Sequence, residues 1–266
     1  MIKVIMAGAG GRMGVIIIKL IAAQKDMVLS GALENEKFPG LGKDIGEFIG
    51  IGKLGVSIVS DLSKIAPECD VIIDFTSPAS TMANLAVAIK AKKAFIIGTT
   101  GIDDAQKIQI AEAGKSIPVV FSASMSAGVN LLFKLAKEAA KVLRDYDAEI
   151  VETHHRFKKD APSGTALKLG ESIASGRGID FKKNTVFGRE GITGERKPDE
   201  IAIHAVRSGD VAGEHTVSFG TIGERIELVH RASSREAYGR GAILAVRYIT
   251  KAKKGLYDMQ DVLKLK

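Results

Sequence analysis

The first half of the chain alternates short apolar runs with segments of helical periodicity. Residues 2–7, 27–33, 71–75, 94–97 and 117–121 are nearly continuous apolar runs, and residues 14–24, 79–90 and 103–114 have apolar positions at helical spacing. Apolar strands that are separated by helices are typical of a parallel sheet covered on both faces. This half therefore predicts an α/β fold, a Rossmann-type doubly wound parallel sheet, with a glycine-rich loop region at residues 38–55.

The pattern changes after Val129. Helices are expected at residues 131–143 and 165–175, and strands at 148–153, 200–206, 215–219 and 225–230. The last three strands follow one another through glycine turns, which favours an antiparallel or mixed sheet in an α+β domain. Residues 237–249 return to a helical period, and we expect them to pack on the first domain. The predicted domains are residues 1–126, completed by residues 235–266, and residues 127–234.

The composition is that of a globular protein of two domains, with 266 residues, 45% apolar and 26% charged. No apolar stretch reaches the roughly 18 residues of a membrane span, and the N-terminal residues lack a signal-peptide cleavage site. Cys69 is the single cysteine, which excludes an intrachain disulfide and fits a reducing cytoplasm. We therefore expect a cytoplasmic protein with no membrane partner.

The net charge of +7 raises the question of nucleic-acid binding. Nucleic-acid binders cluster Lys and Arg with stacking aromatic residues between them. In this chain the basic residues are dispersed among acids, Trp is absent and aromatics make up 5%. The composition therefore predicts no nucleic-acid partner, and leaves either a solvated basic surface or a site for small anions.

A glycine-rich loop follows the first expected strand and opens the first expected helix. Gly8 permits a tight turn, and Gly10 removes a side chain where a pyrophosphate must approach the backbone. The helix N-terminus then offers free N–H groups and the positive end of its dipole. The match to the dinucleotide fingerprint is imperfect, since Met13 stands at its last glycine position and Gly14 follows. A tight strand–helix turn without a ligand is the alternative.

Two further features favour a nicotinamide dinucleotide. Glu34 ends the second expected strand, where an acid can accept hydrogen bonds from ribose hydroxyls. The Gly-Thr-Thr-Gly run at residues 98–101 lies at the carboxyl end of a later strand, the edge where such sheets bind ligands. A solvated strand end and a second turn are the corresponding structural alternatives.

The most informative segment is residues 152–166, ETHHRFKKDAPSGTA. An expected strand leads into two histidines, three basic residues and a Pro-Ser-Gly turn before a helix. Ser163 is a good helix N-cap, and Gly164 and Thr165 would present N–H groups to a carboxylate or phosphate. Adjacent strand residues point to opposite faces, so His154 and His155 can share a pocket only where the strand ends.

Other chemistries account less well for this segment. Zinc would favour histidines four residues apart with a nearby acid, and the only cysteine is distant in sequence, so we expect no metal. Ser163 is better explained by capping than as a nucleophile, because no nucleophile elbow surrounds it. A basic surface loop with exposed histidines remains an alternative.

Together the segments resemble the dihydrodipicolinate (4-hydroxy-tetrahydrodipicolinate) reductase family. The family's G-A-G-G-R-M-G loop is similar to residues 8–14, its G-T-T-G to residues 98–101, and its E-x-H-H-R-x-K-x-D-A-P-S-G-T-A to residues 152–166. Similar stretches at residues 188–196, 207–215, 222–235 and 255–263 extend the resemblance over essentially the whole chain. The histidine–lysine segment is the specific signal, whereas the glycine loop alone occurs in many families.

The resemblance implies reduction of 4-hydroxy-tetrahydrodipicolinate to tetrahydrodipicolinate with NADH or NADPH, in the diaminopimelate route to lysine. It implies a substrate-binding and oligomerisation domain at residues 127–234 and a homotetramer. His154 is then the acid/base candidate and Lys158 the proton donor, while His155, Gly164 and Thr165 hold the dicarboxylate. The implied cofactor residues are Gly8, Ala9, Gly10, Gly11, Arg12, Met13, Glu34, Gly98, Thr99, Thr100, Ser122, Ala123, Ser124 and Met125.

The sequence departs from the family pattern in two places. Asn35 stands where several relatives have an Arg that can pair with the 2′-phosphate of NADPH, so NADH is expected to serve at least as well. Arg12 and Lys37 are the alternative cations for that phosphate. Ser124 and Met125 replace a familiar Asn-Phe pair near the expected nicotinamide site. The alternatives are another Rossmann-type imine reductase, which leaves the histidine–lysine segment unexplained, and a protein that senses NAD(H) without turnover.

Overall fold

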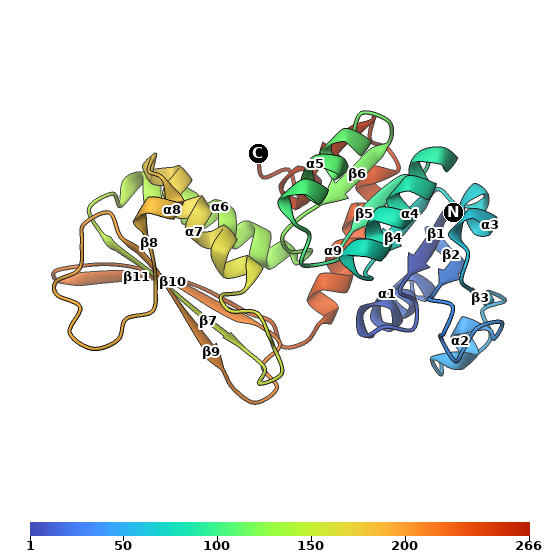
Figure 1. Ribbon diagram of the computed structural model, residues 1–266, viewed down its shortest axis with the longest axis horizontal. Helices are drawn as coiled ribbons and strands as arrows, with labels where there is room; N and C mark the ends of the chain where they lie inside the picture. Colours follow the sequence, from blue (N-terminus) through green and yellow to red (C-terminus); the bar gives the residue numbers. More distant parts are fainter. The chain divides into compact units, whose positions relative to one another are not determined.

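The computed structural model describes residues 1–266. The chain forms two compact units, one made of Met1–Ser126 and Glu236–Lys266 and the other of Ala127–Arg235. Each unit has its own sheet (Figure 1). Each also has its own apolar core.

The first unit is built on a seven-stranded parallel sheet in the order β12-β6-β5-β4-β1-β2-β3. Its strands are β1 (Ile2–Ala7), β2 (Met27–Leu33), β3 (Ile58–Val59), β4 (Val71–Asp74), β5 (Ala94–Ile97), β6 (Pro118–Phe121) and β12 (Gly255–Tyr257). The order steps outward from β1 to β3 on one side and from β4 to β6 on the other. This is the doubly wound arrangement that the sequence predicts.

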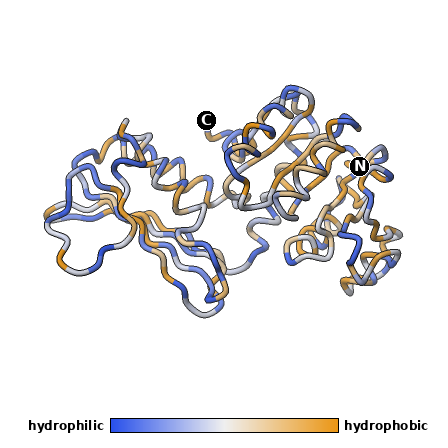
Figure 2. Tube along the Cα trace, viewed as in Figure 1, coloured by the Kyte–Doolittle hydropathy of each residue, from blue (hydrophilic) through white to orange (hydrophobic).

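Helices cover both faces of this sheet. They are α1 (Arg12–Ala22), α2 (Ile45–Phe48), α3 (Leu62–Ile65), α4 (Pro78–Ala91), α5 (Asp104–Ala113), α9 (Glu236–Ile249) and α10 (Met259–Val262). Alternate residues of β1 serve the two faces: Val4 and Met6 pack with α1 and α9, and Ile5 and Ala7 pack with α4 and α5. Figure 2 shows the resulting hydrophobic positions along the central strands.

The second unit is a five-stranded mixed sheet with helices on one face. Its elements are α6 (Ala127–Val142), β7 (Asp147–His154), α7 (Gly164–Arg177), α8 (Phe181–Asn184), β8 (Thr185–Phe187), β9 (Ile201–Arg207), β10 (Glu214–Thr221) and β11 (Glu224–Arg231). The strand order is β11-β10-β7-β9-β8, with β7, β9 and β8 parallel and β10 and β11 antiparallel to their neighbours. Helices α6 and α7 bury one face around Ile150 and Phe219.

The predicted fold class and the return of residues 237–249 to the first sheet are confirmed, because α9 packs there. Three details differ from the expectation. The region 38–55 contains the short helix α2, and the C-terminal segment adds an unforeseen edge strand, β12. Strands β9 and β10, although consecutive, are not paired, because β7 lies between them. None of the helices has both the length and the apolar character needed to cross a membrane.

Candidate active site

The glycine loop between β1 and α1 is shaped by close backbone contacts. Gly8 has a φ of +79°, and a Cβ atom there would lie 2.5 Å from the carbonyl oxygen of Phe75. A Cβ atom on Gly10 would lie 2.2 Å from the Phe38 ring. Gly8 therefore requires glycine for both its conformation and its space, whereas a side chain at position 10 would have to displace the Phe38 ring.

The structure brings Glu34 to this loop, 24 residues away in sequence from Gly10. The Gly10 N–H donates to Glu34 Oε1 at 2.9 Å, and the Asn35 amide N–H groups point to Glu34 Oε2 at 3.2 and 3.3 Å. Helix α1 begins after Gly11 with no side-chain cap and no acid in its first turn. The uncapped N–H groups suit the phosphates of a dinucleotide, and the nearby carboxylate of Glu34 suits its ribose hydroxyls. These residues therefore fit such a cofactor.

A buried aspartate joins the neighbouring loops at the same sheet edge. Asp74, at the end of β4, accepts hydrogen bonds from the hydroxyls of Thr76, Thr81 and Thr99 at 2.7, 2.8 and 3.0 Å. The Asn84 side-chain amide donates to the second carboxylate oxygen at 2.7 Å. Asp74 thereby fixes the Gly-Thr-Thr-Gly loop after β5, although the sequence drew no attention to it.

The segment after β6 completes this edge. Ser124 and Met125 are buried, and a Cβ atom on Gly241 of α9 would lie 1.7 Å from the Met125 carbonyl oxygen. The implied cofactor residues thus follow β1, β2, β5 and β6, all at the carboxyl edge of one parallel sheet. That edge is where ligands bind in doubly wound folds.

In the second unit, β7 carries a buried carboxylate–histidine pair at its carboxyl end. Glu152 is fully buried, and its Oε2 is hydrogen-bonded to Nδ1 of His154. Arg207 donates through Nη1 and Nη2 to the two oxygens of Glu152, both at 3.0 Å, and the Ser163 N–H donates at 3.1 Å. Burial alone would raise the pKa of Glu152, but these donors hold it down at about 2.

Lys158 lies on the loop that follows this strand. Its Nζ donates to both carboxylate oxygens of Asp160, at 2.9 and 2.8 Å, and its side chain is 18% exposed. Burial acts to raise the pKa of Asp160, but the Lys158 ammonium holds it below its ordinary value. Arg207 also donates to the Asp160 carbonyl at 2.7 Å, so one guanidinium connects this loop with the buried glutamate.

The start of α7 lies against the same cluster. Ser163 caps the helix, with its Oγ accepting from the Ala166 N–H at 3.1 Å, as predicted. The same Oγ is 3.1 Å from Nε2 of His215, which lies on β10. The ring of His215 meets that of His154 edge to face, with centroids 5.2 Å apart. Burial lowers the pKa of His215 to about 3, so this ring is neutral.

The remaining predicted residues lie close to this cluster. Strand β7 ends at His154, so His155 follows the strand rather than lying within it. Gly164 and Thr165 form the first turn of α7, and nothing lies within 4 Å of the Cβ position of Gly164. No group of three or more His, Cys, Asp or Glu side chains is arranged to hold a metal ion.

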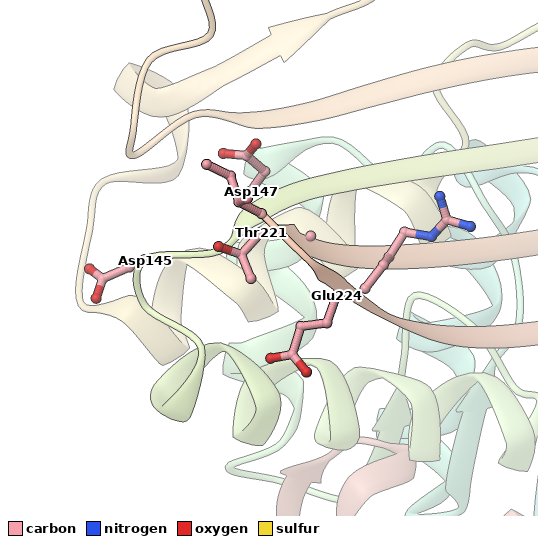
Figure 3. A pocket seen from close by; sticks show the side chains of 7 residues that line it. Asp145, Asp147, Thr221 and Glu224 are labelled. Atoms are coloured by element: carbon pink, nitrogen blue, oxygen red, sulfur yellow. The ribbon is translucent and has the colours of Figure 1, made fainter.

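A separate shallow pocket lies at the other end of β7. Figure 3 shows Asp145, Asp147 and Glu224 around it, with Thr221 at the end of β10. The eight-residue strand β7 places Asp147 and His154 at its opposite ends, roughly 23 Å apart at the usual rise. This acidic hollow is therefore distinct from the candidate site.

The first unit has the fold and the glycine loop of a Rossmann-type dinucleotide-binding protein, and the second has a buried carboxylate–histidine pair with a lysine on the loop that follows it. A family model described as dihydrodipicolinate reductase, N-terminus, matches residues 2–125, and one described as dihydrodipicolinate reductase, C-terminus, matches residues 128–263. The chain belongs to the dihydrodipicolinate reductase family, which confirms the resemblance drawn from its motifs.

Several relatives match over their full length. The 4-hydroxy-tetrahydrodipicolinate reductase of Cupriavidus pinatubonensis is 52% identical over 99% of this chain and 100% of its own length. That of Hahella chejuensis is 49% identical over 100% of both chains. Among solved structures, a dipicolinate-bound dihydrodipicolinate reductase from Paenisporosarcina sp. TG-14 covers 98% of both chains, with a TM-score of 0.76 and 24% identity, and so shares the fold.

Proposed function

We propose that this chain reduces 4-hydroxy-tetrahydrodipicolinate to tetrahydrodipicolinate with NADH or NADPH, in the diaminopimelate route of lysine biosynthesis. The observation that carries the proposal is the cluster of the Glu152–His154 pair and Lys158 beside the start of α7. Relatives that match over their full length, with 49% and 52% sequence identity, are named for this activity. Family, fold and side-chain chemistry thus agree on one reaction.

The reaction loses water and then adds a hydride and a proton to a conjugated imine. Electron density builds on the ring as the hydride arrives, and a nearby proton donor lowers that barrier. His154 acts as the acid/base group, and Lys158 donates the proton. The ammonium of Lys158 also attracts a substrate carboxylate, which would replace Asp160 as its partner.

The substrate dicarboxylate is held by His155 and by the N–H groups of Gly164 and Thr165. Gly164 is exposed, and a side chain at its position would meet open space, so its backbone is accessible. The helix dipole of α7 adds to the attraction for an anion at this end.

A bound nicotinamide dinucleotide supplies the hydride. The glycine loop from Gly8 to Met13 would hold its phosphates, and Glu34 would accept from its ribose hydroxyls. Residues 98–100 and 122–125 would hold the remainder. We infer that NADH serves at least as well as NADPH, because Glu34 opposes a 2′-phosphate and Asn35 offers it no cation.

We further propose that the enzyme is a homotetramer in the cytoplasm, without nucleic-acid or membrane partners. The face of the second sheet opposite α6 and α7 carries the exposed valines Val151, Val206 and Val229, at 40–43% exposure. Val151 and Val229 are both paired with Thr216, and so they lie on one face. Exposed apolar side chains gathered on an uncovered sheet face are typical of a subunit interface.

The test follows the absorbance of the reduced nicotinamide with freshly generated 4-hydroxy-tetrahydrodipicolinate. Wild type is compared with Lys158→Ala and with Lys159→Ala, an adjacent exposed lysine, as the matched control. We expect rapid oxidation by wild type and Lys159→Ala, and a fall in kcat of about 100-fold or more in Lys158→Ala. A folded wild-type protein that binds NADH but oxidises none would refute the proposal and favour another imine substrate or an NAD(H) sensor.

A further inference from the structure

Glu152 is a buried charge whose surroundings are specific. Its two oxygens accept from His154, from both terminal nitrogens of Arg207 and from the Ser163 N–H. A buried carboxylate is costly unless such donors surround it, and a neutral residue would pack there at lower cost. The arrangement therefore serves a purpose other than stability.

The carboxylate determines which nitrogen of His154 carries a proton. An ionised carboxylate only accepts hydrogen bonds, so the Nδ1 that faces Glu152 must be the protonated nitrogen of the neutral ring. Nε2 is then left as the atom that can exchange a proton with a ligand. A carboxylate behind a histidine fixes both its tautomer and its ring orientation in the same way at other sites.

Arg207 extends this control to the lysine. Its Nη2 donates to Glu152 Oε1 at 3.0 Å and to the Asp160 carbonyl at 2.7 Å. Asp160 in turn holds the Nζ of Lys158. One side chain on β9 thus links the carboxylate behind the histidine with the residue that holds the lysine.

We propose that Glu152 and Arg207 are positioning residues, Glu152 holding His154 in the Nδ1–H form and Arg207 holding both Glu152 and the Lys158 loop in place. The inference rests on the proposed function, in which His154 and Lys158 carry the proton transfers. Neither positioning residue is required to touch the substrate.

The chain contains a matched control for this pair. Glu149 lies on the same strand, three residues earlier and on the opposite face of the sheet. Burial would raise its pKa, but Arg189, His204 and Arg196 hold it at about 2, as for Glu152. Arg189 bonds both oxygens of Glu149, at 3.0 and 2.9 Å, and neither Glu149 nor Arg189 bonds to His154 or Lys158. Glu149→Gln therefore removes a similar bidentate arginine pair away from the candidate site, on a side chain that is 27% exposed whereas that of Glu152 is fully buried.

The experiment measures kcat, the KM for NADH and the KM for the substrate in wild type, Glu152→Gln, Arg207→Lys and Glu149→Gln. The same proteins are studied by ¹⁵N NMR with labelled histidines. His154→Asn assigns the His154 signals. We expect kcat to fall about 100-fold in Glu152→Gln and about 10-fold in Arg207→Lys, with the KM for NADH unchanged within about twofold. The His154 signals should show an Nδ1–H ring in wild type and lose that form in Glu152→Gln. Glu149→Gln should leave kcat and these signals unchanged.

Two outcomes overturn the inference. One is a wild-type His154 whose neutral ring carries its proton on Nε2, a result that does not depend on any variant folding. The other is an equal fall in kcat for Glu152→Gln and Glu149→Gln, which would mean that both pairs only support the fold. Full activity of His154→Asn would instead reject the proposed role of the histidine, while the NMR result would still decide whether Glu152 sets its tautomer.

Discussion

A Cβ atom on Gly14 would lie 2.1 Å from the carbonyl oxygen of Gly8. It would also lie 2.7 Å from the carbonyl oxygen of Ala9, so the first turn of α1 runs directly against the loop backbone. In the simple dinucleotide fingerprint, the last glycine permits this close packing of helix and strand. Here Gly14 has that role, which explains how Met13 is tolerated at the fingerprint position.

Replacing Gly14 with alanine should therefore damage the first unit. The added methyl must displace backbone rather than a flexible side chain, and we expect a loss of about 2 kcal/mol in the free energy of unfolding. NADH binding should weaken by at least tenfold, since the loop that meets the phosphates must move. Urea unfolding and calorimetric titration with NADH measure the two effects. Gly220→Ala is the control, because nothing lies within 4 Å of its Cβ position, and equal behaviour of both variants would contradict the packing argument.

The elements with strong local periodicity could be predicted from the sequence. Residues 27–33 and 94–97 form β2 and β5 at the expected bounds. A short, nearly continuous apolar run that is flanked by polar residues is typical of a buried strand, so its ends can be located from the sequence. Strand β12 was not foreseen, since it has three residues and exists only through its pairing with β6, a contact between distant segments. The separation of β9 from β10 by β7 is likewise a property of the whole sheet.

The candidate site shows the same division. The histidines, the lysine and the capping serine lie in one segment and could be recognised there. The partners that set their chemistry come from elsewhere: Arg207 is 55 residues from Glu152, and His215 is 52 residues from Ser163. Both residues bound the family-like stretch 207–215, but nothing in that stretch assigns them a role beside Glu152 or Ser163, and only the sheet register does so. The spacing in sequence of Glu34 and the glycine loop was, in contrast, informative, and the structure joins them.

Cofactor preference should respond to one substitution beside Glu34. Asn35→Arg places a cation where a 2′-phosphate would lie next to the adenosine ribose, and charge-assisted hydrogen bonds there favour NADPH. We expect the ratio of kcat/KM for NADPH to that for NADH to rise roughly tenfold, about 1.4 kcal/mol. Steady-state assays with both cofactors measure the ratio, and Asn35→Gln controls for the loss of the Asn35 side chain. An unchanged ratio in Asn35→Arg would mean that the ribose binds elsewhere.

Assembly should depend on the open face of the second sheet. Val151→Lys puts a charge among the exposed valines, and its burial in an interface would be costly. We expect light scattering after gel filtration to show tetramers for wild type and smaller species for the variant, without loss of secondary structure. Ile108→Lys is the control, because it replaces another exposed apolar residue, on α5 of the first unit. This variant should stay tetrameric. Tetramers of Val151→Lys would place the interface on another surface.

The pH dependence of stability should reflect the buried neutral ring of His215. Its pKa is lowered from 6.5 to about 3 in the fold, so between these values the unfolded chain binds a proton that the folded chain excludes. The contribution of His215 to the free energy of unfolding is therefore fully present above pH 6.5, and it falls as the pH decreases through this window. The slope approaches about 1.4 kcal/mol per pH unit. The depressed pKa values of Glu149 and Glu152 add their own loss only below about 4.5, their ordinary value.

Urea unfolding between pH 7.5 and 5.5 reports mainly the histidine contribution, since those glutamates, with an ordinary pKa of 4.5, are mostly ionised there in both states. His215→Gln keeps a polar group near Ser163 but cannot take up a proton, so its unfolding free energy should vary less with pH than that of wild type. His230→Gln provides a graded comparison, because burial lowers the pKa of His230 as well and this ring is less buried. It should flatten the profile by a smaller amount. If His215→Gln retains the full wild-type slope, another group takes up the proton, and the neutral ring beside His154 is not the origin of the acid sensitivity.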